Sequence, residues 1–213
     1  MKNHETRTVD GDVKPGDRLL FHYSGHGSQI VDRHGDELND RMDEIICPYD
    51  MDWDRNFITD DDLRELFAGL PQGATLVVVL DACNSGTGTR EMRALEALPM
   101  DLSYRTRFLP PPVDIACRAD EGMQVRKLLK GKDTMNHVLL AACMDNQTSA
   151  DAFIDGRYNG AFTYYLAKHL RDTQGDITRS ELIRRVQASL RFNGFSQIPQ
   201  LECAPAERKK PLL

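Results

Sequence analysis

Short apolar runs alternate with amphipathic stretches along this chain, an order typical of a sheet covered by helices. Three runs rich in aliphatic and β-branched residues predict buried strands, at residues 18–23, 75–80 and 137–142. Helical spacing marks three further ranges, residues 60–67, 160–171 and 178–192. In the last helix, Thr178 and Glu181 would form a capping box. The order of these elements predicts an α/β fold.

Each predicted strand ends in a loop of small or polar residues. The loops are Ser24-Gly25-His26-Gly27-Ser28, Asp81-Ala82-Cys83-Asn84-Ser85-Gly86 and Cys143-Met144-Asp145. Open parallel sheets carry their functional sites at the carboxyl ends of the strands. We therefore expect these three loops to meet at one end of the sheet.

Residues 87–134 break the pattern, with no long periodic run and three successive prolines at 110–112. A loop of this length in a compact domain is typically functional or disordered. It is also strongly basic, through Arg90, Arg93, Arg105, Arg107, Arg118, Arg126, Lys127, Lys130 and Lys132. We treat residues 1–213 as a single domain that contains this long basic loop.

Composition places the chain among ordinary globular proteins. It has 213 residues, of which 40% are hydrophobic and 28% charged, enough apolar surface for one core. The net charge of −6 argues against a general binder of nucleic acid or anionic membranes. The chain has no apolar run near 20 residues, and its first residues lack the apolar core of a signal peptide. These features predict a cytoplasmic protein.

Acidic residues are concentrated between Asp36 and Glu65, where twelve carboxylates face only three arginines. Such a run is commonly a solvated loop, but like charges packed together are unfavourable unless a cation offsets them. A hard metal cation and a basic substrate are the two candidates for that role.

Cys83 and His26 form the most specific chemical pattern. The five cysteines are scattered without a CxxC pair, which argues against a disulfide framework or a zinc knuckle. A nucleophilic cysteine needs a base, donors for an oxyanion and a position at the end of a rigid element. Cys83 follows a buried strand, and His26 follows a neighbouring strand between two glycines. The amides of Gly27 and Cys83 could then form an oxyanion hole.

Taken alone, each of these residues has a simpler interpretation. A cysteine after an apolar strand is commonly a small buried hydrophobe, and a Gly-His-Gly loop is commonly a turn. The two together, in matching positions, favour catalysis. Cys143 also follows a strand but lacks a glycine turn and comes after Ala141-Ala142, so we interpret it as structural.

Two segments resemble the paired active-site signature of metacaspases and their bacterial caspase-like relatives. They are His22-Tyr23-Ser24-Gly25-His26-Gly27-Ser28-Gln29 and Asp81-Ala82-Cys83-Asn84-Ser85-Gly86. Residues 40–50, 58–62, 143–151, 159–166 and 198–201 also resemble the family in the expected order. The resemblance implies a caspase-like three-layer α/β/α sandwich with a mostly parallel central sheet. It also implies a cysteine endopeptidase with a His26–Cys83 dyad that cleaves after Arg or Lys. The basic loop follows the nucleophile strand and carries residues of both kinds, so we expect the protein to cut itself there.

The resemblance assigns further roles. Ser24 and Asp81 match positions that line the pocket for the basic side chain, and a partly buried carboxylate suits guanidinium. Asp43, Asp60 and Asp61 match calcium ligands of the family, and carboxylate oxygens suit calcium. The fourth aspartate of that calcium set falls on Arg90, which puts calcium dependence in question. Asn84 replaces a frequent histidine at a position that neither the dyad nor the pocket uses.

The chain differs from the family pattern at its start. Caspase-like sheets begin with a strand, a helix and another strand before the histidine strand, and here about sixteen residues precede it. We expect one edge of the histidine strand to be unpaired, which favours pairing with a second chain unless the sequence is a fragment or a truncated gene model. The alternative function is therefore a truncated, weakly active or inactive caspase-like module that acts through binding or through sheet completion with a partner. Another peptidase of the same clan, such as a clostripain-like one, is the second enzyme candidate.

Overall fold

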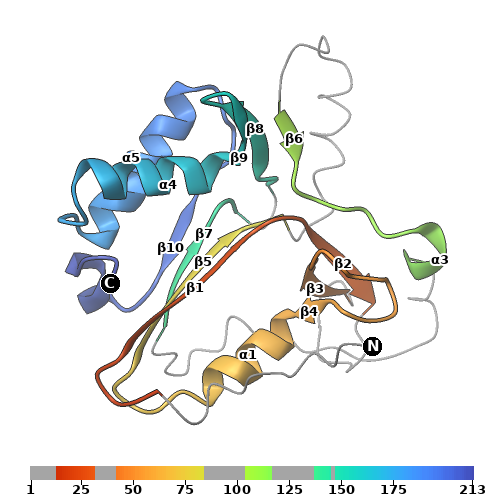
Figure 1. Cartoon of the computed structure of the whole chain (residues 1–213), viewed down its shortest axis with the longest axis horizontal. Helices are drawn as coiled ribbons and strands as arrows, with labels where there is room; N and C mark the ends of the chain where they lie inside the picture. Colours follow the sequence, from red (N-terminus) through yellow and green to blue (C-terminus); the bar gives the residue numbers. More distant parts are fainter. Residues whose placement is uncertain (1–12, 32–41, 84–103, 117–136, 145–146) are drawn as a thin grey trace.

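A four-stranded sheet forms the centre of the molecule (Figure 1). A computed structural model of the chain describes residues 13–31, 42–83, 104–116, 137–144 and 147–213. The strands of the central sheet are, in spatial order, β1 (Arg18–Ser24), β5 (Thr75–Asp81), β7 (His137–Ala141) and β10 (Gln200–Glu202). The first three are parallel, and β10 is antiparallel to β7. The three predicted strands are confirmed to within one residue at each end.

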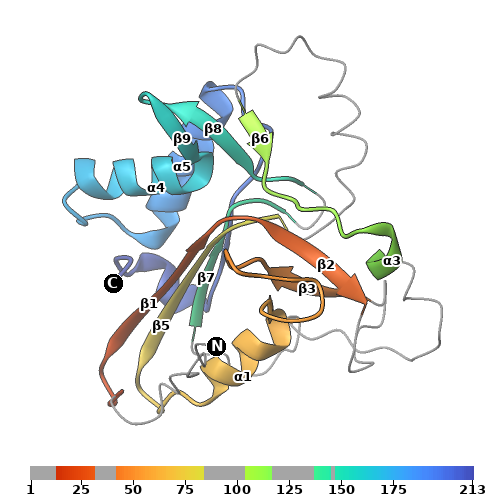
Figure 2. The same cartoon turned by 45° about the vertical axis from the view of Figure 1, so that its right-hand side comes forward.

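Helices cover both faces of this sheet. Figures 1 and 2 show α4 (Ala161–Asp172) and α5 (Arg179–Phe192) on one face and α1 (Asp60–Ala68) on the other. The short helix η4 (Pro205–Lys209) packs against α5 near the carboxyl end of the chain. The predicted three-layer α/β/α architecture with a mostly parallel sheet is therefore confirmed. No helix in the described part of the chain is long and apolar enough to cross a membrane.

The main core fills the space between the sheet and the α4–α5 pair. Val77, Val79 and Leu140 from the strands pack with Phe162 of α4 and Leu182 of α5, all nearly inaccessible to solvent. This burial explains why β5 is almost purely aliphatic, since both of its faces are covered. The rigid parallel strands fix the positions of the loops that follow them.

Side-chain caps define where α1 and α5 begin. Thr59 and Asp62 form a full capping box at the start of α1. Thr178 accepts a hydrogen bond from the Glu181 N–H at the start of α5, so half of the predicted capping box is present. The carboxylate of Glu181 binds Arg184 and Arg185 instead of the cap backbone.

Two small sheets flank the central one and were not predicted. The first has the order β2 (Gly27–Val31), β3 (Met42–Ile46) and β4 (Ile58–Thr59). The second has the order β6 (Tyr104–Thr106), β8 (Ala150–Ile154) and β9 (Arg157–Gly160). A short helix, α3 (Val113–Ala116), packs against β2 through Ile115, within a second apolar cluster. The segment expected to be a structureless loop therefore contains a strand and a helix, while its residues 87–103 and 117–134 lie outside the described residues.

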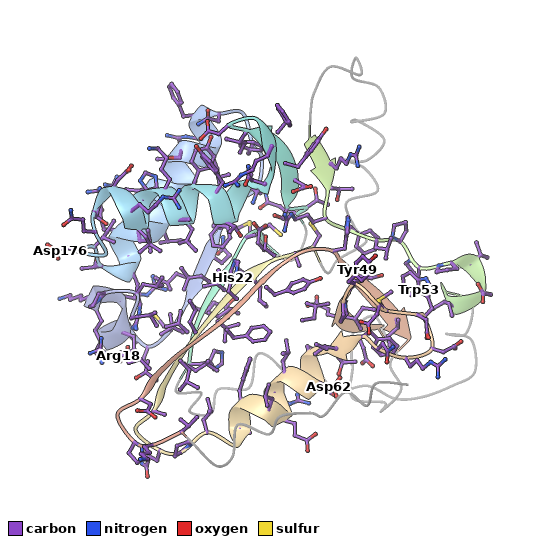
Figure 3. All side chains as sticks on the ribbon, in the orientation of Figure 1. Arg18, His22, Tyr49, Trp53, Asp62 and Asp176 are labelled. Carbon is purple, nitrogen blue, oxygen red and sulfur yellow. The ribbon has the colours of Figure 1, made fainter. Side chains whose placement is uncertain are left out.

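Strand β1 is the edge of the central sheet. Among the described residues it pairs only with β5, as the sequence predicts for the histidine strand. Its side chains alternate between half-buried and exposed, and Leu20 is 49% exposed. Figure 3 shows Arg18 and His22 on this strand. The histidine strand thus has its hydrogen-bonding groups on one side free of any described strand.

Candidate active site

The parallel register of β1 and β5 brings His26 and Cys83 to the same end of the sheet. Ser24 is aligned with Asp81, so His26 and Cys83 each lie two residues beyond an aligned pair. The Gly25 N–H donates to the Asp81 carbonyl oxygen at 3.1 Å, which ties the two loops together. The side chain of His26 is exposed, whereas Cys83 is completely buried.

Tyr23 holds the histidine loop in place. Its hydroxyl donates to the His26 carbonyl oxygen at 2.7 Å, and the Cys47 N–H also donates to that oxygen at 3.0 Å. Burial raises the pKa of Tyr23 to about 12, so the hydroxyl stays protonated and remains a donor. A Cβ on Gly25 would lie 2.6 Å from the Tyr23 hydroxyl oxygen, which explains the glycine at that position. The backbone of His26 is therefore fixed, while its ring faces solvent.

Hydrogen-bond donors surround the sulfur of Cys83. The Ser149 N–H donates to Sγ at 2.5 Å. A hydrogen bond from the Cys143 side chain lowers the pKa of Cys83, with further help from the backbone N–H groups of Ser149 and Arg107, against the opposing effect of burial. The pKa of Cys143 is raised by the same interaction and by burial. Cys143, which the sequence analysis interprets as structural, is therefore a neighbour of the candidate nucleophile.

Asp81 is fully buried and its carboxylate is satisfied by neutral donors. Oδ1 accepts from the Ser149 hydroxyl at 2.5 Å. Oδ2 accepts from the N–H and hydroxyl of Thr163 at 2.9 and 2.7 Å. Thr163 lies in the first turn of α4, where the helix dipole favours a negative charge. These contacts satisfy the carboxylate and fix its orientation at the end of β5.

A guanidinium occupies the position predicted for the substrate's basic side chain. Arg107 Nη1 donates to the Ser24 hydroxyl at 2.7 Å and to the Asp81 carbonyl oxygen at 2.9 Å. Its Nη2 donates to Asp151 Oδ1 at 2.9 Å. The Asp81 carboxylate lies 4.0 Å from Nη1, close enough for ionic attraction but not for a hydrogen bond. Ser24 and Asp81 thus do meet at a site that binds a basic side chain, with Asp151 as an additional partner.

The backbone of Arg107 is also held on both sides. Strand β6 pairs antiparallel with β8, and the Arg107 N–H donates to the Ser149 carbonyl oxygen at 3.0 Å. The Arg107 carbonyl oxygen accepts from the Gly27 N–H at 2.9 Å. In Figures 1 and 2 the chain runs from β6 past the ends of β1 and β5 toward α3. We call residues 104–109 the strap.

Asp43, Asp60 and Asp61 do not form a metal centre in the described part of the chain. No cluster there brings together three or more side chains of the metal-binding types. Asp43 is buried in β3, and Asp61 bonds to Arg64 within α1. Burial, with a smaller contribution from Asp61, raises the pKa of Asp60. As placed, these carboxylates do not fit a calcium ion, and the expected calcium dependence stays a prediction.

Comparison with known proteins identifies the family of this chain. Residues 1–210 match the family model described as the Caspase domain. The chain belongs to the caspase-domain family. It is 31% identical to Metacaspase-1 of Schizosaccharomyces pombe over 224 residues, covering 93% of this chain and 52% of the relative. It is 34% identical to Metacaspase-3 of Arabidopsis thaliana over 186 residues, covering 84% of this chain and 47% of the relative. The chain thus spans about half the length of the curated relatives it matches.

A solved structure has the same fold. The crystal structure of a Geobacter sulfurreducens protein superposes with a TM-score of 0.64 at 25% sequence identity. The match covers 94% of this caspase-domain chain and 72% of the other. Both comparisons support the resemblance read from the two active-site motifs.

Sequence reasoning assigned no role to four residues that build this caspase-domain site: Arg107, Ser149, Asp151 and Thr163. Ser149 and Asp151 lie in segment 143–151 and Thr163 lies in segment 159–166, and both segments resemble the family. Arg107 was one of nine basic residues in the long loop. The resemblance of these segments to the family could have indicated Ser149, Asp151 and Thr163. Only the tertiary structure shows that their side chains lie beside Asp81 and Arg107.

Proposed function

We propose that this protein is a cysteine endopeptidase that cleaves peptide bonds after Arg, and less efficiently after Lys, with Cys83 as nucleophile and His26 as acid and base. The observation that supports this most is the guanidinium held by Ser24, Asp151 and the Asp81 carbonyl oxygen beside Cys83. It defines a pocket of matched charge and geometry next to a thiol with a lowered pKa.

The reaction would follow the usual course of thiol acyl transfer. The Cys83 thiolate attacks the carbonyl carbon of the substrate's basic residue, and the N–H groups of Gly27 and Cys83 stabilise the oxyanion. Protonated His26 gives its proton to the leaving amine, which departs with the carboxyl-terminal part of the substrate. His26 then takes a proton from a water molecule, which hydrolyses the thioester and restores the Cys83 thiolate and protonated His26. The exposed ring of His26 is open to both the leaving amine and that water.

Charge sets the specificity of this pocket. An aspartate in place of arginine would bring carboxylates within a few ångströms of each other, a repulsion of roughly 4 kcal/mol at an effective dielectric of about 20. That corresponds to about three decades in rate, so Asp-directed cleavage is excluded on this proposal. Arginine should exceed lysine because Nη1 and Nη2 serve different partners at once, whereas an ammonium offers a single nitrogen.

A panel of fluorogenic peptides that differ only in the residue before the cleaved bond tests the proposal. We expect the rate order Arg, then Lys, with Asp near background, and Asp81→Asn or Asp151→Asn should reduce the preference for Arg. Cys83→Ala is the negative control. Faster turnover of the Asp peptide than of the Arg peptide would refute this assignment.

Calcium activation remains a prediction from the family resemblance, and no step above uses a metal. Turnover of the Arg peptide with added calcium and with a chelator decides it. Equal turnover with calcium and with the chelator, together with wild-type turnover by Asp60→Asn, would exclude calcium activation. That result would leave the proposed peptidase activity intact.

The alternative function, binding through sheet completion, is favoured by one observation, the unpaired side of β1 among the described residues. In that case a strand from a second chain would pair with β1 by backbone hydrogen bonds. Sedimentation analysis of Cys83→Ala would reveal a concentration-dependent dimer. A backbone-blocking Leu20→Pro change should abolish that dimer, while Leu20→Thr should keep it. A monomer at all concentrations excludes self-pairing through this edge.

A further inference from the structure

We propose that Gln197 is a positioning residue of the peptidase, because its buried amide fixes Ser149 against both Cys83 and Asp81. The inference rests on the proposed function and adds a further part to the same site. Gln197 acts through Ser149 and not by touching the substrate. Three features support this role: the contacts of the amide, the contacts of Ser149, and a second glutamine that holds the first in place.

Gln197 joins the end of β7 to the beginning of β8. Its side chain is buried, with only 4% of the residue exposed. Oε1 accepts from the Ala150 N–H at 2.9 Å, and Nε2 donates to the Ala142 carbonyl oxygen at 3.0 Å. Nε2 also donates to the Ser149 hydroxyl oxygen at 3.4 Å. A carboxylate or an aliphatic side chain cannot make both kinds of hydrogen bond, so this position requires an amide.

Ser149 carries the constraint to the nucleophile and to the pocket. Its N–H donates to Cys83 Sγ at 2.5 Å, and its hydroxyl donates to Asp81 Oδ1 at 2.5 Å. Because Gln197 donates to the hydroxyl oxygen, the single hydroxyl proton is directed to the carboxylate. Ser149 has no exposed surface, so both contacts are shielded from water and strengthened by that shielding. One buried residue therefore aligns a donor to the thiolate with the pocket carboxylate.

A second glutamine holds Gln197 in place. Gln147 Oε1 accepts from the Ile198 N–H at 2.9 Å, and its Nε2 donates to the Ser196 carbonyl oxygen at 3.0 Å. These contacts bind the backbone on both sides of Gln197. Gln147 belongs, like Ser149, to the connection between β7 and β8, so the two glutamines bind each other's segments reciprocally. This arrangement restricts movement of the connection.

The position of the Ser149 N–H bears directly on the reaction. After the hydrogen bond from the Cys143 side chain, this N–H makes the next contribution that lowers the pKa of Cys83. A hydrogen bond weakens steeply as its alignment is lost, so a displaced N–H would raise that pKa. Because the thiolate is the reactive form, the displacement would reduce activity at lower pH. The Ser149 hydroxyl acts separately, since it orients Asp81 and not the sulfur.

Three substitutions separate these effects. Gln197→Met fills a similar volume but loses both kinds of hydrogen bond, so it should move the acid limb of kcat/KM to higher pH and raise the KM for an Arg peptide. On that limb kcat/KM should fall by roughly tenfold, the effect of losing one hydrogen bond to a charged group. Ser149→Ala keeps the N–H and loses the hydroxyl, so it should raise the KM alone. Gln187→Met is the matched control, because Gln187 donates to the Pro199 carbonyl oxygen of the same segment, and it should change neither quantity.

A titration of the Cys83 thiolate by its ultraviolet absorbance gives a readout that does not need turnover. The signal of each variant is compared with that of the same variant carrying Cys83→Ala, so that the other cysteines cancel. The midpoint should lie at higher pH in Gln197→Met than in wild type and should be unchanged in Ser149→Ala. Where Gln197→Met does not fold, Gln147→Met should shift the midpoint in the same direction by a smaller amount.

A wild-type midpoint in folded Gln197→Met or Gln147→Met would overturn this inference alone. An equal shift in Gln187→Met would do the same, because it would reduce the effect to general loosening of the segment. A shift in Ser149→Ala as large as that in Gln197→Met would refute the role of the N–H. A midpoint shifted as expected, with no turnover of the Arg peptide by wild type, would instead overturn the proposed function.

Discussion

Cys83 and Cys143 follow neighbouring parallel strands, but only Cys83 has donors arranged around its sulfur to stabilise a thiolate. Cys83→Ala should abolish peptidase activity without unfolding the protein, because alanine fits the same space. His26→Ala should reduce kcat nearly as far, since members of a dyad act as a unit. Cys143→Ala should keep measurable activity at neutral pH. An active Cys83→Ala and an inactive Cys143→Ala would reverse the assignment.

The hydrogen bond from Cys143 predicts a pH effect. The thiolate is the reactive form, so a lowered pKa of Cys83 keeps the enzyme active at lower pH. Removing the largest contribution, in Cys143→Ala, should raise that pKa and move the acid limb of kcat/KM to higher pH. Cys143→Ser retains a donor and should restore the wild-type limb. An unchanged limb in Cys143→Ala would show that Cys143 does not tune the nucleophile.

Gly160 provides a direct test of the pocket. A Cβ there would lie 2.2 Å from Asp81 Oδ2 and 2.7 Å from Arg107 Nη2. Its φ of −61° suits alanine, so backbone strain does not enter. Gly160→Ala should therefore raise the KM for the Arg peptide clearly, while it lowers the melting temperature only slightly. An unchanged KM would mean that the pocket lies elsewhere.

At the scale of single residues, two short motifs were enough to predict that the loops of Ser24, His26, Asp81 and Cys83 meet, while the catalytic and binding roles of these residues stay predictions. The sequence was insufficient for Asp151, Ser149 and Thr163, because each of them contacts a partner that lies 44 to 82 positions away in the sequence. Arg107 was visible only as one basic residue among nine. Its place in the pocket depends on the β6–β8 pairing, which leaves no periodic signal.

At the scale of elements, burial decided what could be predicted. Strands β1, β5 and β7 and helices α1, α4 and α5 are long or strongly apolar, and their patterns were read within a residue or two. Strands β2–β4, β6, β8 and β9 have two to five residues and mixed polarity, and they exist through non-local pairing. The strap falls in this second class.

Capping gives the elements a measurable test of stability. Thr59→Ala removes the hydroxyl that accepts from the Asp62 N–H but keeps the backbone N–H that donates to the Asp62 carboxylate, and it should lower the free energy of unfolding by about 1 kcal/mol. Thr59→Ser keeps the cap and serves as the control. Denaturant unfolding of both variants measures the difference. Equal stability of Thr59→Ala and wild type would show that this cap contributes nothing.

At the scale of the whole molecule, the register of two parallel strands produces the site. The β1–β5 pairing aligns Ser24 with Asp81 and so brings the histidine and cysteine loops together. Strand β8 of the second small sheet and the residue just before it then supply Asp151 and Ser149 from a distant part of the chain. One architecture thereby brings together the residues that we propose as nucleophile, oxyanion donor and pocket for a basic side chain.

The most direct test of the central claim is covalent labelling by a peptide with an arginyl chloromethyl ketone, which needs both the pocket and the nucleophile. Arg107→Ala leaves the pocket free, and we expect this variant to carry one label, on Cys83, with the aspartyl analogue giving none. Asp151→Asn in the same background should slow labelling. Modification of Cys143 or another cysteine, or faster labelling by the aspartyl analogue, would contradict a Cys83 peptidase directed to arginine.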